Sequence, residues 1–206
     1  MAQVGFWRGV VVGALLSLVG VVILTVGFVV YGQYQIGKRA EERREQQVSR
    51  SGLTLHPPDF SRSDSGNSAE YSWTLRDMDD ELVAFEDFRG RVVVLTFWAT
   101  WCLPCDAEIP TIDALMTRMG DRPSLAFALV SDEDLDVVNK HAEKNALDVP
   151  LYAAEGGIPG VFFAETRPTA FILSCDGKIV YKHVGAADWN DESVVEFLEG
   201  HLRECS

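Results

Sequence analysis

The longest hydrophobic segment of the chain lies near its N-terminus. Between Arg8 and Lys38 there are 29 consecutive residues without a charged side chain. A helix needs about 20 apolar residues to cross a bilayer, and the stretch from Val10 to Tyr31 is long enough. A cleaved signal peptide is the alternative, but its apolar region is about 7 to 15 residues long and ends in small residues, whereas this run ends in YGQYQIGK. The pattern favours an uncleaved single-pass anchor within residues 1–37.

Two polar segments follow the apolar run. The first, KRAEERREQQ, is typical of a charged helical extension, and the second, SRSDSGNSAE, is rich in Ser and Gly and has no periodicity. Such compositions are typical of a flexible tether. We therefore predict three parts, which are a membrane anchor over 1–37, a linker over 38–70 and a folded domain over 71–206.

Within the predicted domain, strand and helix periods alternate. Strand-like patterns predict a hairpin at 71–75 and 81–85, buried strands at 91–98 and 124–130, and a second hairpin at 170–173 and 178–184. Helical spacing predicts three helices. The first follows the paired cysteines and ends at Gly120, the second spans about 132–145, and the third spans about 191–204. This order predicts an α/β domain with a mixed central sheet flanked by helices.

Charge narrows the possible partners. The 206-residue chain is 47% hydrophobic, which is enough for a packed core, and its formal net charge is -13. From Tyr71 onward there are 25 acidic and 11 basic residues. Because such a surface repels phosphate backbones, we expect no nucleic-acid partner.

The charges beside the apolar run leave its orientation open. Five basic residues follow it between positions 38 and 50 and only Arg8 precedes it, so the positive-inside rule places the domain in the cytoplasm. The same segment also contains Glu41, Glu42 and Glu45, and large domains translocate with little regard to flanking charge. The chemistry of the cysteines therefore has to decide the orientation.

Two of the four cysteines are only two residues apart, in FWATWCLPCDAEIP. A zinc site needs four ligands, and the chain has only one such pair of cysteines. The histidines do not have the spacing of metal ligands, and each is expected in solvent or on a helix face. They are His56, His141, His183 and His201. Covalent haem attachment requires histidine after the second cysteine, where Asp106 stands. A purely structural disulfide would close too short a loop to stabilise much. We therefore expect no metal and no cofactor.

A redox role fits the position of this pair. The cysteines follow a buried strand and precede a helical pattern, which places them at a helix N-terminus. There the unpaired amides and the helix dipole favour a thiolate, so the pKa of the first cysteine can fall from about 8.5 to roughly 3.5 to 7.5. The alternative is a binding, chaperone-like or metal-delivery module, for example for copper. That module lacks the Met and His ligands expected to accompany the thiols.

The segment RGRVVVLTFWATWCLPCDAEIPTIDAL resembles the thioredoxin-like family, specifically its membrane-anchored TlpA/ResA type, and YSWTLRDMDDELVAFEDFRG resembles the lead-in hairpin of that type. The resemblance covers about Tyr71 to Ser206. It implies a thioredoxin fold and thiol-disulfide exchange on the extracytoplasmic (periplasmic) side. It also implies that the protein reduces exported proteins, with cytochrome c maturation as one role. A membrane redox donor would then reduce the protein again.

The resemblance also implies roles for individual residues. Cys102 would be the exposed nucleophile and Cys105 the buried resolving thiol. Trp101 would shield the pair, and Leu103 with Pro104 would tune its redox potential. Trp101 and Pro104 are also expected to contact substrate.

Glu108 is the expected replacement for a missing acid. Thioredoxin itself has a buried Asp before FWA, where this chain has Thr96. Glu108 matches the acidic position of the TlpA/ResA type, and residues i and i+3 share a helix face, so it can lie near Cys105. The alternative is a solvated acid on the helix surface. Pro110 matches the family's helix-kinking proline.

Pro168 in TRPTAFIL matches the family's cis-proline, which faces the disulfide and leaves a backbone edge for a substrate strand. Arg167 departs from the small or aliphatic residue usual before it. Its guanidinium would favour the thiolate of Cys102 and acidic substrates, or it would turn to solvent.

The remaining cysteines, Cys175 and Cys205, fall in the turn of the second hairpin and after the last helix. In the thioredoxin fold these positions can meet, and a bridge requires Cα atoms within about 7 Å. Such a bond lasts only in an oxidising compartment. Two unpaired thiols are the alternative.

Overall fold

The structure, a computed structural model, describes residues 24–32, 34–35, 38, 53–62 and 66–205. The chain divides into two units, residues 1–43 and 44–206. In the first unit, residues 24–32 are helical. Most of the predicted membrane span lies outside the described residues, and within those ranges no helix has the length and apolar character needed to cross a membrane. The anchor therefore stays a prediction.

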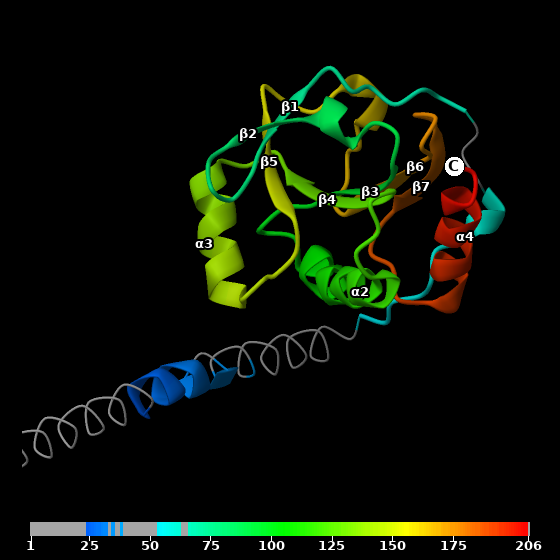
Figure 1. The fold of residues 1–206 in the computed structure, drawn as a ribbon. Coiled ribbons are helices and arrows are strands. Elements are labelled where there is room, and N and C mark those ends of the chain that lie inside the picture. The colour runs from blue at the N-terminus through cyan, green and yellow to red at the C-terminus, as the bar shows by residue number, and fades with distance from the viewer. Residues whose placement is uncertain (1–23, 33, 36–37, 39–52, 63–65, 206) are drawn as a thin grey trace, which may run out of the picture. The chain divides into compact units, whose positions relative to one another are not determined.

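A seven-stranded mixed sheet forms the centre of the second unit, in the order β2-β1-β5-β4-β3-β6-β7 (Figure 1). Its strands are β1 (Thr74–Arg76), β2 (Leu82–Ala84), β3 (Val92–Phe97), β4 (Leu125–Ser131), β5 (Leu151–Glu155), β6 (Thr169–Leu173) and β7 (Ile179–Val184). β3, β4 and β5 are parallel, and the other neighbours pair antiparallel. The predicted α/β domain with a mixed sheet and two hairpins is confirmed.

The two faces of the sheet are covered differently. The helices are α2 (Leu103–Met119), α3 (Leu135–Asn145) and α4 (Glu192–Leu202), with short 3-10 turns at Phe60–Arg62, Phe85–Phe88 and Gly160–Phe162. Buried side chains of all three helices belong to one core cluster. Figure 1 shows α2 below β3 and β4, α3 beside β2 and β5, and α4 beside β6 and β7. Side chains alternate along β3 accordingly, since Val92 and Val94 join the core cluster of the helices and Val93 joins the opposite cluster.

The structure adds one strand that we did not predict. β5 contributes Leu151 and Ala153 to the buried layer, and it pairs parallel with β4 and antiparallel with β1. It is short, and two of its five residues are alanine, so its period-2 signal is weak. Its pairing explains how the lead-in hairpin becomes part of the main sheet.

Part of the segment predicted as a linker packs on the domain. The ring of Phe60 stacks on Phe197 with centroids 4.2 Å apart and lies 4.6 Å from Tyr181. Asn67 accepts a backbone hydrogen bond from Ile179 at the start of β7. Residues 53–62 therefore form an ordered strap on the domain and are not a flexible tether, because Phe60 packs against Tyr181 and Phe197.

Candidate active site

The paired cysteines lie at the N-terminus of α2, shortly after the end of β3. Cys102 is the N-cap of α2 and forms a disulfide with Cys105, with Cα atoms 5.2 Å apart. The Cys102 sulfur also accepts a hydrogen bond from the Cys105 N–H at 3.2 Å. The first N–H groups of a helix have no partner within the helix, and the dipole there favours negative charge. This end of α2 is therefore built to stabilise a Cys102 thiolate when the disulfide is reduced.

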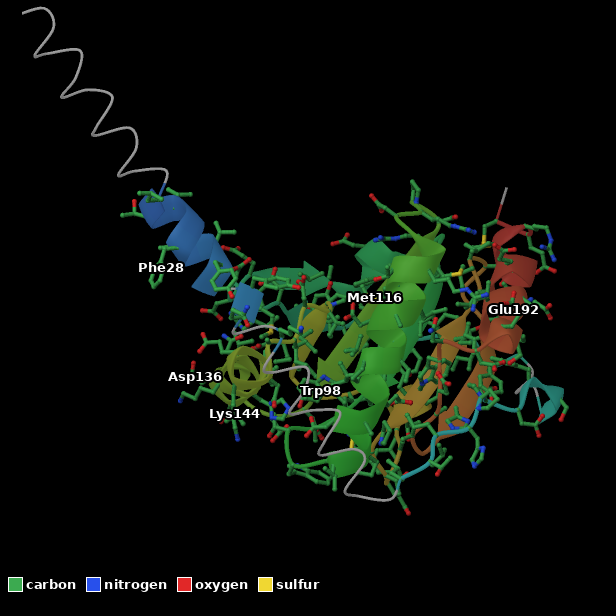
Figure 2. All side chains as sticks on the ribbon, turned by 90° about the horizontal axis from the view of Figure 1, so that it is seen from below. Phe28, Trp98, Met116, Asp136, Lys144 and Glu192 are labelled. Carbon is green, nitrogen blue, oxygen red and sulfur yellow. A yellow bond between two sulfur atoms is a disulfide. The ribbon has the colours of Figure 1, made fainter. Side chains whose placement is uncertain are left out.

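The disulfide is more enclosed than predicted. Cys105 is fully buried, as expected, but Cys102 is only 3% exposed because it packs in the same core cluster as Trp98 and Ala99. The prediction of an exposed Cys102 was wrong for this oxidised form. Trp101, by contrast, is 74% exposed. Figure 2 shows Trp98 beside the N-terminal half of α2, at the end away from Met116.

Two residues between the cysteines face outward. Leu103 is 42% exposed, and Pro104 in the first turn of α2 is also exposed. Proline is tolerated there because its missing N–H is one that a helix leaves unpaired. An incoming polypeptide thus meets Trp101, Leu103 and Pro104 before it reaches sulfur.

The loop before Cys102 is fixed by an acid that the sequence did not single out. Glu133, after β4, accepts hydrogen bonds from the Thr100 N–H at 2.6 Å and from the Thr100 hydroxyl at 2.8 Å. Ser131 also donates to Glu133, at 3.2 Å. Glu133 belongs to an acidic run, SDEDLD, in which nothing in the sequence distinguishes one carboxylate from the next.

Arg167 and Pro168 are joined by a cis peptide bond, as predicted. The Arg167 side chain is 11% exposed, and its guanidinium contacts Asp132 at 3.2 Å and the carbonyl of Ala164 at 2.9 Å. It also lies 5.9 Å from the ring centroid of Phe97. The solvent-facing alternative is therefore wrong. The ion pair with Asp132 offsets the positive charge of the guanidinium, which weakens the other alternative, a bias toward acidic substrates.

Glu108 is buried in α2, 1% exposed, so the alternative of a solvated helix acid is wrong. Its Oε1 accepts hydrogen bonds from the Trp189 indole N–H at 2.5 Å and from the Ala187 N–H at 3.2 Å. Burial raises the pKa of the Glu108 carboxyl to about 8, although both hydrogen bonds act in the opposite direction. A carboxyl group that is neutral near pH 7 and stands one helical turn from Cys105 can exchange a proton with a thiol.

Two further polar side chains are largely buried. Thr96, where thioredoxin has its buried Asp, is 1% exposed, and its hydroxyl has no hydrogen-bond partner within the described ranges. His141, which we had placed in solvent or on a helix face, pairs with Asp106 at 2.9 Å and is mostly buried. Neither side chain replaces Glu108 as a buried acid.

Cys175 and Cys205 form a second disulfide, with Cα atoms 5.7 Å apart. It ties the β6–β7 turn to the segment after α4, and no cysteine of the chain is left free. In the described part of the chain no group of His, Cys, Asp and Glu side chains is arranged to hold a metal ion.

Comparison with known proteins decides the family. The profile of the Redoxin family matches residues 56–198. The chain belongs to the Redoxin family. It is also 29% identical over 159 residues to the thiol-disulfide oxidoreductase ResA of Bacillus cereus, covering 75% of this chain and 88% of that protein. The thioredoxin-like protein YneN of Bacillus subtilis is 31% identical over 115 residues, covering 55% and 68%.

Solved structures agree on the fold of this Redoxin-family protein. A thiol-disulfide oxidoreductase from Bacteroides fragilis superposes with a TM-score of 0.53 at 24% identity, covering 65% of this chain and 98% of that one. This match shows the thioredoxin-like fold. The family profile and the relatives above establish a thiol-disulfide oxidoreductase of the ResA type, as the motif predicted.

Proposed function

We propose that the chain is a membrane-tethered reductant that exchanges disulfides with exported proteins through Cys102 and Cys105. The observation that carries this proposal is the buried Glu108 carboxyl one helical turn from the resolving Cys105. An acid at this place supplies the proton transfer that a dithiol needs in order to resolve a mixed disulfide.

The reaction then has two steps. The Cys102 thiolate attacks a sulfur of the partner disulfide, which forms a mixed disulfide and expels the partner's other sulfur as a thiolate. Cys105 next loses its proton to the ionised form of Glu108, which is the minor form at pH 7 because burial raises the pKa of this carboxyl to about 8. The Cys105 sulfur then attacks the Cys102 sulfur. The Cys102–Cys105 bond forms, the bond to the partner breaks, and the partner leaves as a dithiol. The protein is oxidised, and a membrane redox donor must reduce it again.

The electrostatics of the site support this direction of exchange. Thiols with a low pKa stabilise the reduced form of a CxxC pair and make it an oxidant. Negative charge on the ionised fraction of Glu108 disfavours a thiolate beside it and so disfavours the reduced form. Glu108 therefore opposes the effect of the helix N-terminus and favours reduction of partners.

An extracytoplasmic location is supported by the second disulfide, because such bonds persist in oxidising compartments. The exported proteins reduced there include, as one candidate class, those whose paired cysteines must be reduced before haem is attached. The basic residues after the apolar run argue for the opposite orientation, but that charge rule weakens for large domains.

Trapping the mixed disulfide tests the proposal. In Cys105→Ala the second step is blocked, so covalent complexes through Cys102 should accumulate in the native membrane and can be identified by mass spectrometry. Cys102→Ser should form no such complexes. Robust reduction of a disulfide substrate by Cys102→Ser would contradict the mechanism, and complexes only with cytoplasmic proteins would contradict the location.

A further inference from the structure

The loop between β7 and α4 donates hydrogen bonds directly to the buried carboxyl group of Glu108. The Trp189 indole N–H and the Ala187 backbone N–H both donate to Glu108 Oε1. The Trp189 backbone N–H donates to the Thr111 hydroxyl at 3.0 Å, and this hydroxyl lies 2.8 Å from the Glu108 carbonyl oxygen. Trp189 itself is fully buried. The carboxyl group is thus held from a segment about 80 residues away in the sequence.

The two oxygens of Glu108 have different surroundings. Oε1 accepts two N–H groups, whereas Oε2 is buried and has no hydrogen-bond partner within the described residues. An indole N–H can only donate. An oxygen that already accepts two donors is a poor site for a proton, so in the neutral carboxyl the hydrogen belongs on Oε2.

We propose that Trp189 is a positioning residue for the exchange reaction, since its indole N–H holds Oε1 and assigns the proton transfer with Cys105 to Oε2. This rests on the proposed role of Glu108. In the resolving step the Cys105 S–H bond breaks, the proton passes to Oε2, and the sulfur keeps the electron pair with which it attacks Cys102. Trp189 gains and loses nothing.

The same hydrogen bond keeps part of Glu108 ionised. A bond to a carboxylate is stronger than a bond to a neutral carboxyl, so Trp189 favours the form of Glu108 that can accept a proton. With a pKa of about 8, roughly a tenth of Glu108 is ionised at pH 7. Without the indole donor this fraction falls further.

The pKa of Glu108 could also respond to other titrating groups, and the ones to consider are His183 and Asp106. His183 on β7 faces Trp189 edge-on with ring centroids 6.1 Å apart, and burial lowers the pKa of His183. Asp106 on α2 is paired with His141. The causes acting on the pKa of Glu108 are burial and its two hydrogen bonds. A shift of that pKa on removal of the indole N–H would therefore report the bond itself.

The test uses a chromogenic aromatic disulfide, which releases one coloured thiolate when Cys102 attacks and a second when Cys105 resolves the mixed disulfide. Trp189→Phe removes the donor and keeps an aromatic ring. We expect the pH midpoint of the second release to move up by about one unit or more, and its rate at pH 7 to fall about tenfold. The first release should not change. Replacing Trp189 by benzothienyl-alanine, in which sulfur takes the place of the N–H, should reproduce the shift with the side-chain volume retained.

The matched control is Trp73→Phe. Trp73 is also a buried tryptophan, but its indole N–H has no partner within the described part of the chain and it lies in the opposite core cluster. Its replacement should leave both releases unchanged. In a Glu108→Gln background, Trp189→Phe should cause no further slowing. Equal slowing with and without Glu108 would overturn the proposal, because Trp189 would then act through packing alone. No release at all from the unaltered reduced protein would instead overturn the proposed function.

Discussion

Glu133 accepts two hydrogen bonds from Thr100, one from its N–H and one from its hydroxyl. Thr100 stands two residues before Cys102, so this carboxylate fixes the approach of the chain to the N-cap of α2. Both donors are part-buried. The loop at residues 98–102, which leads to Cys102 and is called the redox loop below, therefore depends for its geometry on an acid just after β4.

Glu133→Ala should loosen the redox loop. It leaves the Thr100 N–H without an acceptor, which costs about 1–3 kcal/mol in the free energy of unfolding. We expect faster amide hydrogen exchange at residues 98–102 and slower attack by Cys102. Glu143→Ala on the exposed side of α3 is the control, and it should change neither quantity. If both variants showed the same exchange pattern as the unaltered chain, Glu133 would not hold the loop.

The parts of this site that could be predicted from the sequence are local. The spacing of Cys102 and Cys105 after a buried strand, and a helical pattern ending at Gly120, lie within one continuous segment, so their geometry follows from the elements that contain them. The i, i+3 relation placed Glu108 near Cys105 for the same reason.

The parts that could not be predicted depend on tertiary contacts. Trp189 lies 81 positions from Glu108, and no local pattern marks either its hydrogen bond or the burial that raises the pKa of the acid. Likewise, Cys102 is enclosed by a core cluster drawn from several elements. The contact of Arg167 with Asp132 depends on two loops that meet only in the folded chain.

The strap at residues 53–62 should contribute to stability. Phe60→Ala removes the ring that stacks on Phe197, and because Phe60 is only partly buried we expect a loss of about 1–3 kcal/mol in the free energy of unfolding. Denaturant unfolding followed by tryptophan fluorescence measures this loss. Phe163→Ala is the control, since Phe163 is 64% exposed and should cost little. Equal stabilities of the two variants would mean that the strap is not part of the folded domain.

The Cys175–Cys205 disulfide should stabilise the domain without taking part in exchange. It closes a loop of 30 residues, and a Cys175→Ser, Cys205→Ser double variant should lose about 3–4 kcal/mol by the loop-entropy relation. The rate of exchange through Cys102 should not change. Alkylation of protein taken from its native membrane without reductant should label neither cysteine. Labelling of both cysteines would mean that the disulfide does not form in cells, and it would weaken the case for an extracytoplasmic location.

The buried Glu108 should make the oxidised protein less stable as the pH rises. Its carboxyl has a pKa of about 8 in the folded chain and about 4.5 in the unfolded chain, so between these values the folded state holds a proton that the unfolded state has lost. Stability is then fully present below about pH 4.5 and is lost as the pH rises toward 8, at about 1.4 kcal/mol for each pH unit.

Glu108→Gln removes this titration and keeps the shape of the side chain. In denaturant unfolding at a series of pH values, the difference in stability between Glu108→Gln and the unaltered chain should grow between about pH 4.5 and pH 8 and then level off. The other titrating groups are the same in both chains, so they cancel in this difference. A difference that stayed constant with pH would mean that Glu108 titrates normally, and it would then be too weak a base to accept the proton of Cys105 as proposed.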